Sequence, residues 1–272
     1  MPRSSLASVS VIVNTFRRPD CLRASVVNWL NCSLGELRVV WSEPAELLPQ
    51  WLLQHELRGE VVVERHSSTN LTNRFAPRRM RPQVSAAFTI DDDVWLSCEA
   101  LAGAHNVYRH DPRRLVGFAA RNLSLHHPGH TAPDGAAGFE AMLGRTPNTV
   151  LATKGAFVPM QLFEAFYSPA LQLLREAINY RVTAEDILMS FVYATNVSLP
   201  VVPVFAPGGV RLCASNHSLG RSTRQHRREV MGRIEAHFGE DALQMSMPSR
   251  LGLIDVFTNR LLTKSGGVKA QL

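Results

Sequence analysis

The sequence lacks any apolar run long enough to cross a membrane. A transmembrane helix needs about 20 consecutive apolar residues, so we expect no membrane span within this chain. Residues 1–7 lead directly into an apolar stretch, and they show neither a signal peptide nor an anchor. We therefore expect either a soluble protein or a catalytic domain taken from a longer chain.

Cysteine is scarce, and its spacing excludes a common kind of metal site. The four cysteines form no C-x-x-C pair: Cys21, Cys32, Cys98 and Cys213. Structural zinc sites use closely spaced pairs of ligands, so we expect no zinc site. Spacing alone assigns no disulfide, and we predict Cys213 to be a small, buried apolar residue.

A recognised nucleic-acid-binding motif is also missing, although the net charge is +6. The excess comes mostly from arginines clustered around 78–81, 109–114 and 221–233. These clusters contain no interleaved aromatic pattern, so they suit surface charge and anion contacts better than DNA or RNA binding. We predict no nucleic-acid partner.

The first 97 residues alternate between strand and helix patterns. Strands are predicted at Val9–Val13, Leu37–Trp41, Val61–Arg65 and Ala86–Ile90, and helices at 19–30, 45–57 and 71–75. Such alternation predicts an α/β fold, Rossmann-like, with a mostly parallel sheet and helices on both faces. The hydrophobic content of 45% is sufficient for one substantial core or two smaller ones.

The second half is less regular. Helices are predicted at 98–109, 161–166, 169–180, from Thr183 as a cap onwards, and at 222–237; strands are predicted at 115–119, 150–158 and 199–205. Prolines interrupt the strand at 199–205, which favours a place at the sheet edge. Residues 126–138 have a loop composition. We predict one domain over 8–258, with a nucleotide-binding half (8–97) and an acceptor-binding half (98–258), followed by a flexible tail at 259–272.

Three consecutive aspartates, Asp91–Asp93, directly follow the predicted strand Ala86–Ile90. Adjacent carboxylates repel one another unless a cation or hydrogen-bond donors neutralise them. In open α/β sheets ligands bind outside the carboxyl ends of the strands, and Mg²⁺ or Mn²⁺ is typically held by one or two carboxylates plus substrate phosphates. The triad therefore suggests a metal–diphosphate site, with a solvated acidic turn as the alternative.

Other polar residues are predicted to reach the same edge of the sheet. Arg18 follows the first strand, and Asn73 with Arg74 follows the third. The planar guanidinium group makes paired hydrogen bonds to phosphate, although an arginine after a strand is often a surface residue. Asp186 could act at a sugar carbon, but Glu185 and Asp186 also suit the first turn of any helix.

The chain resembles the exostosin-type glycosyltransferases of family 64, which have a GT-A fold, over roughly residues 8–255. The resemblance rests on seven segments in order: Val11–Arg18, Val39–Trp41, Leu71–Phe75, Ile90–Asp93, Leu115–Phe118, Lys154–Phe157 and Glu185–Met189. It implies a retaining, metal-dependent transfer of a sugar, an N-acetylhexosamine, from a UDP-sugar to a glycan or glycolipid.

The resemblance also implies a role for individual residues. The donor contacts would be Arg18, Asn73, Arg74, Asp91, Asp92 and Arg121. Asp93 would ligate Mn²⁺, and the catalytic residues would be Asp186, Glu185 and Arg227, with Arg228 as a one-step alternative to Arg227. Family members are mostly Golgi enzymes facing the lumen, or membrane-associated; because the chain shows no signal or anchor, a cytoplasmic location stays open.

Two departures from the family pattern affect these expectations. Ser42, followed by Glu43, stands where the family usually has asparagine, which leaves the choice between UDP and GDP open. Ala184 and Val230 stand where the family has a cysteine pair, so this tie is expected to be absent. The alternatives are a non-catalytic nucleotide-sugar or glycan-binding module, and an inverting GT-A enzyme with the same triad.

Overall fold

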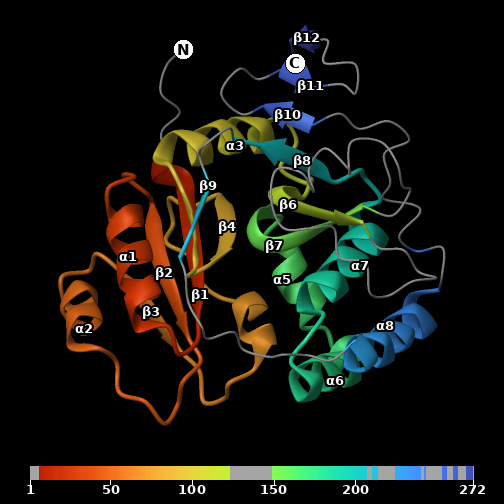
Figure 1. Ribbon diagram of the computed structural model, residues 1–272, viewed down its shortest axis with the longest axis horizontal. Helices are drawn as coiled ribbons and strands as arrows, with labels where there is room; N and C mark the ends of the chain where they lie inside the picture. The colour runs from red at the N-terminus through yellow and green to blue at the C-terminus, as the bar shows by residue number, and fades with distance from the viewer. Residues whose placement is uncertain are drawn as a thin grey trace.

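The structure, a computed structural model, describes residues 6–122, 149–206, 210–213, 224–239, 242, 253–255, 260–262 and 268–271. Its central element is a ten-stranded sheet in the order β12-β11-β10-β8-β6-β7-β4-β1-β2-β3 (Figure 1). All of its pairings are parallel except those made by β7 and β11. The predicted α/β fold with a mostly parallel sheet is confirmed.

The N-terminal half consists of strands joined by helical crossovers. After the short 3₁₀ helix η1 (Leu6–Ser8), the elements are β1 (Val9–Thr15), α1 (Pro19–Leu30), β2 (Glu36–Trp41), α2 (Gln50–Leu57), β3 (Val62–Arg65), the 3₁₀ helix η2 (Leu71–Phe75) and β4 (Ala86–Asp91). These four strands pair in parallel, in the order β4-β1-β2-β3. Their carboxyl ends therefore share one edge of the sheet, as the sequence predicted.

The second half extends the sheet beyond β4. Its elements are β5 (Val94–Leu96), α3 (Cys98–His110), β6 (Val116–Asn122), β7 (Thr149–Val158), α5 (Gln161–Phe166), η3 (Pro169–Leu171), α6 (Gln172–Arg181), α7 (Glu185–Val197), β8 (Val202–Phe205), β9 (Val210–Leu212), α8 (Arg224–Phe238), β10 (Leu253–Asp255), β11 (Arg260–Leu262) and β12 (Val268–Gln271). β7 lies antiparallel between β4 and β6. It thereby joins the two halves of the sheet.

Two predictions about strand placement are wrong. β8 lies between β6 and β10 instead of at the edge, because the chain beyond residue 250 adds strands outside it. The segment 259–272, predicted as a flexible tail, contains β11 and β12, which pair with each other and, through β11, with β10. The predicted loop at 126–138 lies outside the described residues.

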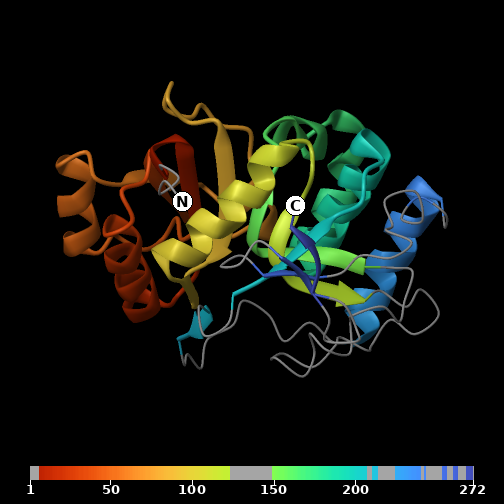
Figure 2. The same cartoon turned by 90° about the horizontal axis from the view of Figure 1, so that it is seen from above.

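Two hydrophobic cores lie on opposite faces of the sheet. Alternate residues of β1 separate them: Val9, Val11 and Val13 belong to one core, and Ile12 belongs to the other. The first core contains side chains of α1, α2 and α3, and the second contains those of α5, α6, α7 and α8. In Figure 2 the yellow helix α3 runs along the sheet, with α8 in blue at the far right. Helices therefore cover both faces, as predicted.

Two disulfides, Cys21–Cys213 and Cys32–Cys98, involve every cysteine of the chain. Cys21 lies in the first turn of α1, and Cys213 directly follows β9, which pairs with β5. The prediction that Cys213 is only a small apolar residue is wrong. Its spacing in the sequence offered no indication of a bond, because the paired cysteines are 192 and 66 residues apart.

Removing the Cys21–Cys213 bond should destabilise the fold. In the double variant Cys21→Ser with Cys213→Ser, we expect the free energy of unfolding to fall by about 2–4 kcal/mol, because the unfolded chain regains the freedom of a long loop. Urea denaturation of the two proteins measures this difference. The variant Cys32→Ser with Cys98→Ser opens a shorter loop and should lose less; the reverse order would contradict the loop-entropy explanation.

Candidate active site

Arg18 brings the ends of β1 and β4 together. It lies between β1 and α1, and its guanidinium group forms ion pairs with Asp93 and, at 2.5 Å from Nη2 to Oδ1, with Asp92. The preceding residue, Arg17, has a φ of 53°, which is uncommon for a residue other than glycine. The chain thus turns sharply at the end of β1, and this turn directs Arg18 towards the aspartates.

Asp92 is fully buried, and its contacts are with other residues of the protein. Its Oδ2 accepts a 2.7 Å hydrogen bond from the Thr15 hydroxyl, and its backbone N–H donates to the Asn14 carbonyl at 3.0 Å. Burial raises the pKa of Asp92 to about 7, against the opposing effects of Arg18 and Thr15. In this arrangement the carboxylate faces Arg18 and Thr15, which fits a residue that positions Arg18.

Asp93 is the most accessible member of the triad, with 30% of its side chain exposed. Burial, followed by the charge of Asp91, raises its pKa, while Arg18 and Lys154 act in the opposite direction. Lys154, on β7, is therefore a further cation near the triad, and it was not among the residues predicted for the site. The K-G-A-F segment that contains it was the available signal.

The donor set can be compared with the needs of a divalent cation. Within the described residues, no three His, Cys, Asp or Glu side chains form a ready-made metal cluster. Mg²⁺ and Mn²⁺ in nucleotide sites need only one or two carboxylates, and phosphate and water oxygens complete the shell. A partly exposed carboxylate at a strand end fits this requirement, and Asp93 is the residue that would hold the ion.

A second buried cluster joins η2, β4 and α7. Arg74, with 6% of its side chain exposed, donates a 2.7 Å hydrogen bond to Asp91 and lies 3.7 Å from a carboxylate oxygen of Glu185. Burial alone would lower the pKa of Arg74, but the nearby carboxylates raise it overall. Burial raises the pKa of Glu185 to about 7, and Arg74 opposes this shift. The structure thus brings Arg74, Asp91 and Glu185 together.

Asp186 lies in the first turn of α7, beside Glu185. Its Oδ1 accepts a 2.9 Å hydrogen bond from the backbone N–H of Ile187, at the helix end that favours negative charge. The prediction that Thr183 caps this helix is wrong: the N-cap is Ala184, with a φ of 72° and no side-chain cap. The Thr183 hydroxyl instead lies 3.5 Å from Nε of Arg227.

Helix α8 packs beside the start of α7. Arg227 points its guanidinium group towards Thr183, whereas Arg228 is exposed. Of the two arginines, Arg227 is therefore the one that contacts Thr183, three residues before Asp186. Ala184 and Val230, which replace the family's cysteine pair, are both buried in the same core. At the two positions where the family has a disulfide, this chain therefore has buried apolar side chains in a shared core.

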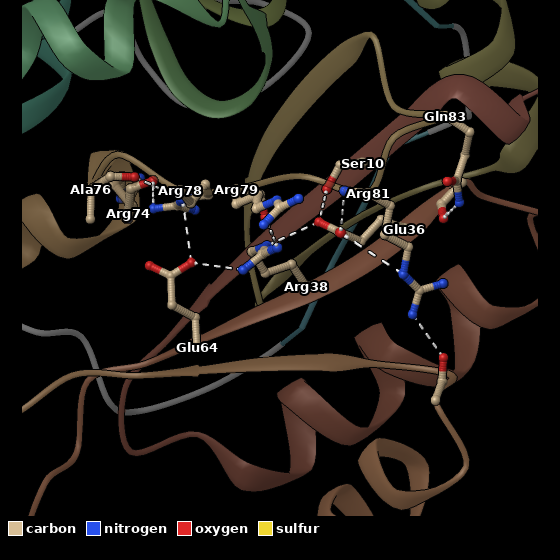
Figure 3. A network of polar contacts seen from close by, with 12 residues as sticks. Ser10, Glu36, Arg38, Glu64, Arg74, Ala76, Arg78, Arg79, Arg81 and Gln83 are labelled. Atoms are coloured by element: carbon tan, nitrogen blue, oxygen red, sulfur yellow. Dashed lines mark hydrogen bonds and ion pairs between the residues drawn. The ribbon is translucent and has the colours of Figure 1, made fainter.

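Asn73 and Arg74 are held by a polar network that was not predicted from the sequence (Figure 3). Arg78 donates from Nη2 to the carbonyls of Asn73 and Arg74, both at 2.9 Å. Its Nε lies 3.3 Å from Glu64, and the network continues to Arg38 and beyond. The signal was the presence of charged residues inside predicted strands, where unpaired charges are costly.

The remaining predicted donor contacts are Asn73 and Arg121. The Asn73 side-chain amide donates to Ser42 Oγ at 3.0 Å and to the Ser68 carbonyl at 2.9 Å. Ser42, the departure from the family pattern, is thus a direct neighbour of a predicted donor contact. Arg121 lies on β6 opposite Val150, and its side chain lies outside the described part of the chain.

A pocket of about 320 Å³ lies beside Arg18. The residues that line it come from the ends of β1 and β2 and the segments that follow them: Thr15, Arg17, Pro19, Trp41, Glu43, Glu46, Leu47 and Pro49. Edges of this kind, at the carboxyl ends of parallel strands, are where open α/β sheets bind ligands. In the sequence, Glu43 was notable only as the residue that follows the departure at Ser42.

The sequence matches a known protein family. The model of the glycosyl transferase family 64 domain matches residues 9–249, which is most of the chain. The chain belongs to this family. It is therefore a glycosyltransferase, as the resemblance implied. The matched range includes Arg18, both acidic clusters and Arg227.

Several curated relatives have names that state a sugar. The glycosylinositol phosphorylceramide mannosyl transferase 1 of Arabidopsis thaliana is 28% identical over 85% of this chain and 72% of the relative. Glucosamine inositolphosphorylceramide transferase 1 of the same plant is 27% identical over 76% of this chain, and human exostosin-2 is 28% identical over 63%. This chain spans about a quarter of the length of these last two relatives.

Solved structures include more distant matches. The structure of S. aureus TarS 1-349 in complex with UDP-GlcNAc is 12% identical in sequence to this chain. The match covers 85% of this chain and 66% of the TarS chain, with a TM-score of 0.47.

Among the described residues, no helix is both long enough and apolar enough to span a bilayer.

Proposed function

We propose that this glycosyltransferase transfers a sugar from a nucleoside diphosphate sugar to a glycan or glycolipid, with retention of configuration and with Mn²⁺ as its cofactor. The observation that carries the proposal is the meeting of two arginine–carboxylate clusters at one sheet edge. Arg18 pairs with Asp92 and Asp93, while Arg74 pairs with Asp91 and lies near Glu185. This edge thus combines positive groups for a diphosphate with carboxylates for a metal and a reacting sugar.

Each group has a distinct role in this proposal. Asp93 holds the metal, and Arg18 and Arg74 bind the diphosphate through paired, charge-assisted hydrogen bonds. When bound, the metal offsets the negative charge that develops on the leaving diphosphate. Asp186 stabilises the oxocarbenium-like sugar carbon from the start of α7. Arg227, on α8, supports the departing diphosphate, and Asn73 fixes the donor beside Ser42.

The sugar and the acceptor are less closely defined than the reaction class. The family resemblance favours UDP-N-acetylhexosamine, whereas the names of the relatives include both a mannosyl and a glucosamine transferase. Two of these names contain inositol phosphorylceramide, which supports a glycolipid acceptor. We further propose work in the Golgi or secretory lumen, and the two disulfides support this location because such bonds persist in oxidising compartments.

Donor turnover in the presence and absence of metal tests this proposal. Purified protein with Mn²⁺ and a panel of UDP- and GDP-sugars should release nucleotide from one donor, and EDTA should abolish this release. Asp93→Asn should lose Mn²⁺-dependent nucleotide binding and lower turnover by about 10²–10³-fold, because the charge of the metal no longer reaches the diphosphate. Turnover that survives both EDTA and Asp93→Asn would contradict the metal role.

The same assay separates the enzyme from the alternatives. Saturable nucleotide binding without turnover of any donor, with or without candidate acceptors, would favour a binding module. The configuration of the product, determined by NMR, would distinguish a retaining from an inverting enzyme. The presence of Glu185 and Asp186 beside the aspartate triad favours the enzyme, since a binding module has no need for these two carboxylates.

A further inference from the structure

We propose that the base of the nucleotide sugar is guanine, and that Glu43 selects it. The inference rests on the proposed function, because it assumes that the diphosphate binds at Arg18 and Asp93. It replaces the UDP donor that the family resemblance implies. Three observations support it: the position of the pocket beside Arg18, the fixed carboxylate of Glu43 in its wall, and the hydrogen-bonding pattern that such a carboxylate can accept.

The pocket lies where the nucleoside would extend from the diphosphate site. Arg17 and Pro19, which flank Arg18 in the chain, both line it. Its volume of about 320 Å³ is at the lower end of the range for small-molecule pockets, so it suits a base better than a whole nucleotide sugar. Trp41, Leu47 and the two prolines provide apolar walls for the faces of an aromatic ring.

Glu43 is held firmly in the wall of this pocket. The residue is only 7% exposed. Its Oε1 accepts a 2.8 Å hydrogen bond from the Arg17 amide, and its carbonyl accepts hydrogen bonds at 3.1 Å from the Trp41 indole and from the Glu46 amide. Side chain and backbone are thus both fixed, and the carboxylate needs no rearrangement before it meets a ligand.

In the part of the chain that the structure describes, the Glu43 carboxylate has no ion-pair partner within 4 Å. By contrast, Asp91, Asp92 and Asp93 each form an ion pair with Arg18 or Arg74. An ionised carboxylate offers about four acceptor positions, of which the Arg17 amide uses one. Neither oxygen of Glu43 is among the fully buried atoms that lack a partner, so the remaining acceptor positions are open to the pocket, where a ligand can supply donors.

Guanine presents the donors that this carboxylate requires. Its N1–H and its N2 amino group lie side by side, so that they can donate two parallel hydrogen bonds to one carboxylate. Uracil presents a single N3–H between two carbonyl oxygens, and those oxygens would face the carboxylate with like charge. A site built around such a hydrogen bond discriminates strongly, because its buried polar group stays unpaired with the wrong ligand.

Calorimetric binding of GDP, UDP and inosine diphosphate, each with Mn²⁺, tests the inference on the unaltered protein. Inosine diphosphate keeps N1–H but lacks the N2 amino group. We expect GDP to bind about 10- to 100-fold more tightly than UDP, and inosine diphosphate to bind about 10-fold less tightly than GDP. Equal or tighter binding of UDP would overturn the inference, because the diphosphate and metal contacts are common to all three ligands.

Substitution of Glu43 then tests the residue. Glu43→Gln keeps the size and the acceptor for the Arg17 amide but removes the paired acceptor, so GDP affinity should fall about 10- to 100-fold while UDP affinity stays within about 3-fold. Glu46→Gln, an exposed carboxylate on the same pocket, should affect both nucleotides alike. A parallel loss of GDP and UDP in Glu43→Gln, in a variant with native circular dichroism, would overturn the role of Glu43.

These measurements separate the inference from the proposed function. Binding of no nucleotide to the unaltered protein would mean that the diphosphate site itself is wrong, and the inference would fall with it. Tight, Mn²⁺-dependent binding of UDP without preference for GDP would leave the diphosphate site intact and overturn only the choice of base.

Discussion

Asp186→Asn is expected to lower the turnover number by about 10²–10⁴-fold, the range typical for loss of a catalytic carboxylate. The substitution keeps the size of the side chain and an oxygen that can accept the hydrogen bond of the Ile187 amide. Donor binding should therefore be preserved while the negative charge near the reacting sugar carbon is lost. Single-turnover kinetics with saturating donor, together with calorimetric nucleotide binding, measure the two effects separately.

A matched substitution tests the simpler explanation that Asp186 only stabilises a helix start. Glu99 also lies in the first turn of its helix, α3, but its side chain is exposed and has no assigned role in the site. Glu99→Gln should retain normal turnover. Near-normal turnover in Asp186→Asn would remove the catalytic role of Asp186, and a loss that appears only as weaker donor binding would reassign this residue to the donor site.

Arg74→Met is expected to lower the free energy of unfolding by about 3–5 kcal/mol, because it leaves buried carboxylates without their cation. Asp91 would lose a 2.7 Å hydrogen bond, and Glu185 would lose the positive group 3.7 Å away. Chemical denaturation followed by circular dichroism measures the change. Arg113→Met, which breaks an exposed pair with Asp111, should have little effect.

The loss in Arg74→Met should depend on pH in a defined direction. The pKa of Glu185 in the folded protein is raised to about 7, from an ordinary value of 4.5, even with Arg74 present. A carboxyl group with a raised pKa in the folded state is tolerated when protonated and becomes destabilising as the pH rises. Without Arg74 this pKa rises further, so the deficit should be larger at pH 8 than at pH 5. A larger deficit at pH 5 would show that another contact of Arg74 dominates.

The sequence predicted those parts of the site that depend on strand order. Because β1 and β4 are parallel neighbours, residues that follow them must share one edge, and Arg18 meets Asp92 and Asp93 there. The prediction required only apolar periodicity and the rule that ligands bind at carboxyl ends of strands. The same rule placed Arg74 at this edge, but its contact with Asp91 also depends on η2, because β3 is not a neighbour of β4.

Contacts between distant segments could not be predicted in this way. The approach of Glu185 to Arg74 depends on how α7 packs against the second core, and no local pattern encodes that packing. The support of η2 by Arg78 is similar, since one arginine within a basic cluster gives no sign of the carbonyls that it will contact. A role for Glu43 could not be predicted either, because it depends on a pocket formed by segments that follow two different strands.

The positions of the paired cysteines also determine the order in which the two disulfides can form while the chain is being synthesised. Cys32 and Cys98 are both available once residue 98 has emerged, whereas Cys21 must wait for residue 213. During that interval the thiol of Cys21 lies 11 positions before Cys32 in the chain, and four cysteines allow three pairings. A nascent chain that oxidises too early can therefore trap Cys21 with the wrong partner, so a disulfide isomerase should increase the yield of active protein.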